Sequence, residues 1–182
     1  MKKRIIALGL LWCLSAVMLQ AARVDTVLVR SAAMNKDVKV VYVLPDKAIG
    51  KQACPVVYLL HGYGGNARSW VQLKPELPQM ADEKGIIFVC PDGKNSWYWD
   101  SPENPAYRYE TFVTSELVKY TDGNYATIPD RKARAISGLS MGGHGALWSA
   151  IRHKDVFGAA GSMSGGVDIL SLIHISEPTR RR

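Results

Sequence analysis

The sequence predicts an α/β fold, a mostly parallel sheet with helices on both faces. Two strand-like runs come first, and strand-like and helix-like segments alternate after them. Residues 56–60 form a continuous apolar run, which is typical of a strand buried on both faces. A Gly-x-Ser-x-Gly motif at 138–142 stands between a strand-like and a helix-like run. These features predict an open sheet whose carboxyl edge binds ligands.

Six strand-like runs are expected in chain order, at residues 25–29, 38–44, 55–60, 86–90, 133–137 and 158–162. Helix-like stretches separate the later runs, at residues 73–84, 110–120 and 141–153. Pro75 and Pro78 should break or kink the first of these helices. The expected domain is cut after about its sixth strand.

The motif at 138–142 makes Ser140 the leading candidate nucleophile. A serine on a sharp strand-to-helix turn has a strained backbone, and only very small residues fit at Gly138 and Gly142. The turn exposes the hydroxyl, and the first N–H groups of the helix point toward any oxyanion formed there. This geometry suits acyl transfer.

A glycine-rich loop, 61–66, follows the expected central strand. Its backbone N–H groups can turn inward and supply one oxyanion donor, and the N–H of Met141 after the serine supplies the other.

Three motifs together resemble the esterase branch of the α/β hydrolases. They are His61-Gly62-Tyr63-Gly64-Gly65, Pro91-Asp92-Gly93 with Ser96-Trp97-Tyr98, and Gly138-Leu139-Ser140-Met141-Gly142-Gly143. That branch includes esterase D or S-formylglutathione hydrolase, feruloyl, acetylxylan and tributyrin-type esterases, and mycolyltransferases. The resemblance, which runs from about Val24 to Ile169, implies the α/β-hydrolase fold, Ser140 as nucleophile and the N–H groups of Tyr63 and Met141 as the oxyanion hole. It also implies a catalytic Asp and His on later strands, and neither is present in this chain.

Three adjacent aromatic residues, Trp97, Tyr98 and Trp99, follow the strand at 86–90. They cannot all be buried on one face, so we expect at least one to line a cleft and contact an aryl acyl group or a sugar ring. Asp92 and Asp100 do not match a Ca²⁺-binding pattern, and we expect neither a metal nor a cofactor.

The histidines before residue 170 are poor candidates for the catalytic base. His144 is four residues after Ser140, in the body of the expected helix and directed under the sheet. His61 is expected to shape the oxyanion loop by a hydrogen bond. His153 is expected to interact with the dipole at the C-terminal end of a helix.

The two ends of the chain are expected to lie outside the hydrolase domain, 22–169. Residues 1–21 have the basic, apolar and small-residue regions of a signal peptide, which predicts export to the periplasm or the extracellular space. Residues 170–182 resemble a translated adapter from DNA library preparation, so His174 has no claim to a catalytic role.

The formal net charge of +7 comes mainly from these ends. Lys2, Lys3 and Arg4 carry three positive charges and the tail a net two, which leaves +2 on residues 22–169. We therefore expect no nucleic-acid partner, and no membrane association after the leader is removed. The oligomeric state is left open.

Cys54 and Cys90 are expected to be unpaired buried thiols. They lie at opposite ends of two strand-like runs, about 15–20 Å apart if the strands are parallel neighbours. This exceeds the roughly 7 Å Cα separation that a disulfide allows.

These features predict an exported serine carboxylesterase that forms an acyl-enzyme on Ser140. Its expected substrates are feruloyl or acetyl esters of plant polysaccharides, or small acyl esters. The present chain, without the Asp and His of the triad, is expected to be inactive. The alternatives are an acyltransferase of the same fold and a non-catalytic fragment or binding module.

Overall fold

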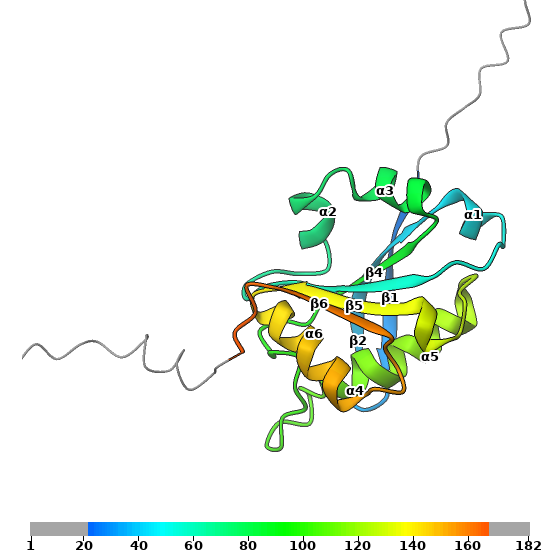
Figure 1. Cartoon of the computed structure of the whole chain (residues 1–182). Coiled ribbons are helices and arrows are strands. Elements are labelled where there is room, and N and C mark those ends of the chain that lie inside the picture. Colours follow the sequence, from blue (N-terminus) through cyan, green and yellow to red (C-terminus); the bar gives the residue numbers. More distant parts are fainter. Residues whose placement is uncertain (1–21, 168–182) are drawn as a thin grey trace, which may run out of the picture.

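The computed structural model describes residues 22–167 and contains a single six-stranded sheet with the order β1-β2-β4-β3-β5-β6 (Figure 1). The expected signal peptide and adapter-like tail lie outside these residues. The strands are β1 (Arg23–Ser31), β2 (Lys36–Leu44), β3 (Val56–Leu60), β4 (Ile87–Pro91), β5 (Arg134–Leu139) and β6 (Ala159–Met163).

The strand directions agree with the predicted mostly parallel sheet. The first pair, β1 and β2, is antiparallel, and β2 is also antiparallel to β4. From β4 onward the sheet is parallel, because β3 pairs with β4 and β5, and β5 pairs with β6. The central position of β3 explains its continuous apolar run, since both of its faces are covered.

Helices cover both faces of the sheet, as expected. Figure 1 shows α2 (Ser69–Leu73) and α3 (Leu77–Lys84) on one side, and α4 (Tyr109–Thr111), α5 (Leu117–Asn124) and α6 (Met141–Arg152) on the other. The short elements α1 (Asp46–Ile49), the π-helical turn η1 (Phe112–Glu116) and the 3-10 turn η2 (Arg131–Ala133) complete the set within residues 22–167. The core accordingly has two layers, one on each side of the sheet.

Two of the expected helices differ in detail. The stretch 73–84 is two helices, because the chain leaves α2 after Leu73 and re-enters a helix at Leu77. Pro78 lies in the first turn of α3, where a missing N–H costs nothing. The stretch 110–120 is interrupted by η1 and continues to Asn124.

Candidate active site

Ser140 occupies the tight turn between β5 and α6 and is exposed to solvent. Its backbone angles are φ 54° and ψ −116°, outside the regions that non-glycine residues normally adopt. Its N–H donates to the carbonyl of Met163 on β6 at 2.8 Å, and its own carbonyl accepts from His144 N–H at 3.0 Å. The strained turn is thus held by hydrogen bonds on both sides.

The two motif glycines leave no room for side chains. A Cβ on Gly138 would lie 2.2 Å from the carbonyl oxygen of Gly142. A Cβ on Gly142 would lie 2.2 Å from the carbonyl oxygen of Leu60, at the end of β3. The turn therefore packs backbone to backbone against the neighbouring strand, and this close packing leaves the Ser140 side chain exposed.

The glycine-rich loop after β3 lies directly against this turn. A Cβ on Gly62 would be 3.6 Å from Cβ of Ser140. Tyr63, the next residue, is exposed, and Met141 occupies the first helical position of α6, where an N–H has no acceptor within the helix. The structure brings the two expected oxyanion donors to the same edge of the sheet as Ser140.

His61 is buried and shapes this loop. Its Nδ1 donates to the carbonyl of Gly62 at 2.7 Å, and its Nε2 accepts from the N–H of Gly93 at 2.9 Å. Its backbone N–H donates to the hydroxyl of Tyr98 at 2.9 Å. Both ring nitrogens are engaged within the protein, so His61 positions the loop and is not placed to accept a proton from Ser140.

Asp92, at the end of β4, is buried beside His61. Burial alone raises the pKa of this carboxyl, but hydrogen bonds from the ammonium and the N–H of Lys94 outweigh it and hold the pKa well below its usual range. The Lys94 ammonium is 2.9 Å from Oδ2, and the Lys94 N–H donates to Oδ1 at 3.0 Å. Asp92 is therefore a charged carboxylate that holds Lys94 in place next to the loop.

Tyr98 was a candidate substrate contact, but its side chain lies in the core. It is fully buried, and its hydroxyl contacts both the N–H and the carbonyl of His61. Its ring fills the space above Gly93 and Gly145, where added Cβ atoms would lie 2.3 and 2.6 Å from ring atoms. Tyr98 therefore packs between the loop after β4, the loop after β3 and α6, and contacts all three.

The other two aromatic residues, Trp97 and Trp99, are half-buried around His144. The indole N–H of Trp99 donates to His144 Nε2 at 2.8 Å, and His144 Nδ1 donates to the carbonyl of Gly166 at 2.8 Å. His144 is buried with both ring nitrogens occupied, as expected for a structural residue.

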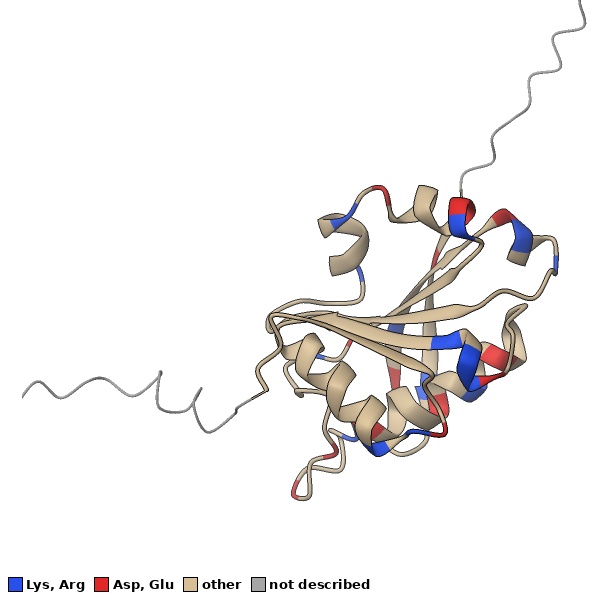
Figure 2. Cartoon of the chain, viewed as in Figure 1, with Lys and Arg blue, Asp and Glu red and all other residues tan. Residues whose placement is uncertain are grey.

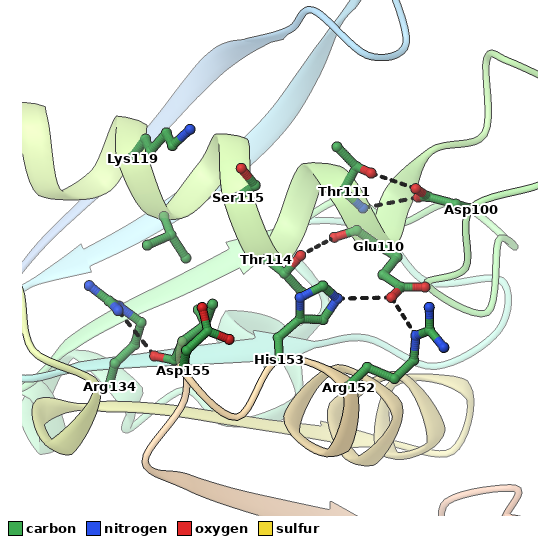
Figure 3. Close-up of a pocket in the computed structure, with 12 residues that line it drawn as sticks. Asp100, Glu110, Thr111, Thr114, Ser115, Lys119, Arg134, Arg152, His153 and Asp155 are labelled. Carbon is green, nitrogen blue, oxygen red and sulfur yellow. Dashed lines mark hydrogen bonds and ion pairs between the residues drawn. The ribbon is translucent and has the colours of Figure 1, made fainter.

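A cavity of about 690 Å³ is separate from this site (Figure 3). It lies between the segment from α4 to α5 and the C-terminal end of α6, and Ser140 does not line it. Figure 3 shows Arg152 and His153 directed toward the Glu110 carboxylate. Arg152 Nε lies 2.7 Å and His153 Nε2 lies 2.8 Å from Glu110 Oε1. His153 thus has a specific carboxylate partner, beyond the helix-end interaction that was expected.

Glu110 was not identified from the sequence. Burial alone raises its pKa, but hydrogen bonds from Trp148, Arg152 and His153 more than offset this, so the pKa is lowered. A lone acidic residue in a helix-like stretch gives no sign that basic partners 42 and 43 residues away will surround it.

Figure 2 shows Lys and Arg interspersed with Asp and Glu along the described part of the chain. Within residues 22–167, no cluster of His, Cys, Asp or Glu has the arrangement of a metal site. None of the helices in this part of the chain has the length and apolar character needed to cross a membrane.

An open, mostly parallel sheet, a strained serine between β5 and α6, and a glycine-rich loop beside that serine define an α/β hydrolase. The chain belongs to the esterase family described as "Putative esterase", whose model matches residues 31–174.

Individual relatives agree with this assignment. An acetyl esterase of Caldicellulosiruptor saccharolyticus is 27% identical over 158 residues, which are 82% of this chain and 59% of that protein. A diacylglycerol acyltransferase/mycolyltransferase Ag85A of Mycobacterium gordonae is 34% identical over 80% of this chain and 43% of its own length. The solved structure of a ferulic acid esterase matches with a TM-score of 0.72 and 31% identity, over 83% of this chain and 63% of that one. The chain thus spans less than two thirds of these relatives.

Proposed function

We propose that this chain is the nucleophile-bearing part of an exported serine carboxylesterase, with Ser140 as the nucleophile. The observation that carries the proposal is the strained, exposed Ser140 facing the Gly62–Tyr63 loop. Backbone strain of this kind costs about 1–3 kcal/mol and persists where the surrounding structure enforces it, most often at functional sites.

In the proposed reaction, Ser140 Oγ attacks the ester carbonyl and a histidine takes its proton. The carbonyl oxygen becomes an oxyanion, which accepts hydrogen bonds from the N–H groups of Tyr63 and Met141. Each such donor lowers the barrier by about 3–4 kcal/mol. The alcohol departs with the proton, and water then releases the acid from the acyl-enzyme.

The base is not among the described histidines. His61, His144 and His153 have partners elsewhere, and no hydrogen bond joins Ser140 Oγ to any residue within 22–167. Removing the base of a serine triad lowers kcat by about 10⁶. The 182-residue chain alone is therefore proposed to be inactive.

The proposed substrates are acetyl or feruloyl esters of plant polysaccharides, with small acyl esters as the second choice. The aromatic loop that contains Trp97 and Trp99, and the likeness to an acetyl esterase and a ferulic acid esterase, support this choice. The leader-like residues 1–21 support export.

An acyltransferase is the second candidate, favoured by the 34% identity to a mycolyltransferase. The two activities differ in whether water or an alcohol attacks the acyl-enzyme. Adding an acceptor alcohol to the assay separates them, because a hydrolase continues to release free acid and a transferase forms a new ester.

The test uses the complete reading frame of the source gene, read across codon 169 and onward. We expect p-nitrophenyl acetate turnover that Ser140→Ala lowers by at least about 10⁴, while Ser115→Ala, a serine on η1, has no effect. The 182-residue chain should show no turnover above background. Equal turnover with and without Ser140 would contradict the proposal and favour a binding module.

A further inference from the structure

A second cavity, of about 360 Å³, lies in the loop between β4 and α4. Two contacts place it beside the candidate active site. Oδ1 of Asn95 accepts from the N–H of Gly64 in the oxyanion loop at 2.8 Å. The ring of Trp99 lies 5.3 Å from that of His144, one helical turn after Ser140. The wall of the cavity is thus joined to the loop after β3 and to α6, the two elements that flank Ser140.

The lining of the cavity combines two flat aromatic rings, Trp99 and Tyr107, with polar side chains that include Asn95 and Asn104. Among residues 22–167, no lysine or arginine lines it. A neutral sugar ring has the matching chemistry, because it presents a flat C–H face to an aromatic ring and a rim of hydroxyls to amides. The charged side chain among the lining residues is the carboxylate of Asp100, which disfavours an anionic ligand.

Hydrogen bonds within the loop hold the cavity wall in place before a ligand binds. Asp100 accepts from the N–H and the hydroxyl of Thr111. The N–H of Ser101 donates to the carbonyl of Tyr107 at 2.7 Å, and Oδ1 of Asn104 accepts from Ala106 N–H at 3.0 Å. Lys36 Nζ lies 4.9 Å from the Tyr107 ring centre. A preformed wall lowers the entropic cost of binding.

Two amide donors remain for a ligand. The Nδ2 groups of Asn95 and Asn104 donate to no acceptor among residues 22–167, although both Oδ1 atoms are used. A sugar ring carries several adjacent hydroxyl groups that can accept hydrogen bonds from these two amides. An aryl acyl group carries fewer hydrogen-bond acceptors.

We propose that this cavity is a subsite for a neutral sugar ring in the alcohol portion of the ester. The inference rests on the proposed function, since it places the acyl group at Ser140 and the sugar beside Asn95, Trp99 and Tyr107. It assigns polysaccharide recognition to the loop of residues 95–107.

The experiment measures binding directly and requires no ester cleavage. Xylotetraose, a neutral oligosaccharide without ester groups, is titrated into the folded chain by calorimetry and tryptophan fluorescence. We expect saturable binding that Tyr107→Leu weakens by about tenfold, which corresponds to about 1.4 kcal/mol. Asn104→Asp keeps the acceptor for Ala106 and removes the donor, so it should weaken binding several-fold. Asn124→Asp on α5 makes the same charge change away from the cavity and should leave binding unchanged.

The absence of saturable binding would overturn the subsite, as would equal binding by wild type and Tyr107→Leu with both variants folded by circular dichroism. Ferulic acid that binds with the same dependence on Tyr107 while xylotetraose does not would assign the cavity to the acyl group instead. Sugar binding without Ser140-dependent turnover of the complete protein would support the subsite and contradict the esterase, so the two failures are distinguishable.

Discussion

Ser140 and Tyr98 show how single side chains prepare this site. Ser140 is held in an unfavourable conformation by the carbonyl of Met163 and by the glycines around it. Tyr98, itself at φ 59°, fixes the loop opposite through its hydroxyl. Ser140 and the loop are thus positioned separately, and each depends on a few polar contacts.

Replacing Tyr98 by phenylalanine should destabilise the protein by about 1–3 kcal/mol, because the buried N–H of His61 would lose its acceptor. The ring would still fill the space over Gly93 and Gly145. Urea unfolding measures the loss, and faster hydrogen exchange at the His61 amide locates it. Tyr63→Phe, at an exposed position in the same loop, is the control and should change neither measurement. An unchanged exchange rate of the His61 amide in Tyr98→Phe would show that the Tyr98 hydroxyl does not position the loop.

Glu110 should make stability depend on pH on the acidic side. Its pKa is lowered in the folded state from the ordinary 4.5, so its contribution is complete above about pH 4.5. The contribution is lost as the pH falls through the folded-state value. Between pH 6 and pH 3.5, Glu110→Gln should therefore lose less stability than wild type, although it is less stable at pH 6.

Urea midpoints at the two pH values measure this difference. Glu103→Gln, at an exposed loop position, is the matched control and should follow wild type. Parallel losses in wild type and Glu110→Gln would contradict the assignment.

The junction of β5 and α6 is closely packed. Gly138 touches Gly142 across the turn, and Gly142 touches the end of β3. Backbone atoms cannot move aside as a flexible side chain can, so the small residues are required by packing.

Gly138→Ala should therefore cost about 3 kcal/mol or more, the upper part of the range for overpacked sites. Gly123→Ala is the matched control, since no atom lies within 4 Å of the added Cβ on α5. That control should be stabilising by about 0.5–1 kcal/mol, because alanine favours helix over glycine. Urea unfolding of both variants tests the pair, and similar effects in the two would refute the steric argument.

Across the whole molecule, the sheet divides the apolar core into two layers, and the described cysteines belong to different layers. Cys54 packs in the layer with α5 and α6, and Cys90 in the layer with α2 and α3. Both thiols are free and buried, as the spacing of the strands predicts.

Burial raises the pKa of both thiols, which suppresses the reactive thiolate. The third cysteine of the sequence, Cys13, lies in the leader-like residues 1–21 and is replaced by serine for this test. The native protein should then show no fast reaction with a disulfide reagent at pH 8, and two thiols should react in denaturant. A non-reducing gel without an intramolecular bridge is the second measurement. One fast-reacting thiol in the native state would contradict the burial.

The sequence by itself determined the features that arise within a few residues of the chain. Apolar runs gave the strands and the central position of β3, and the spacing of Gly138, Ser140 and Gly142 indicated the tight turn. Such features are readable because sterics and periodicity act locally.

Only the tertiary structure decided what lies far apart in the chain and meets in space. The Tyr98 hydroxyl binds His61 from 37 residues away, and Glu110 is surrounded by Arg152 and His153. At least one of the three adjacent aromatics was expected to line a cleft, and in the structure Trp99 lines a cavity whereas Tyr98 is buried in the core. Which ring is buried depends on how the loop packs against α6, and no local pattern records that packing.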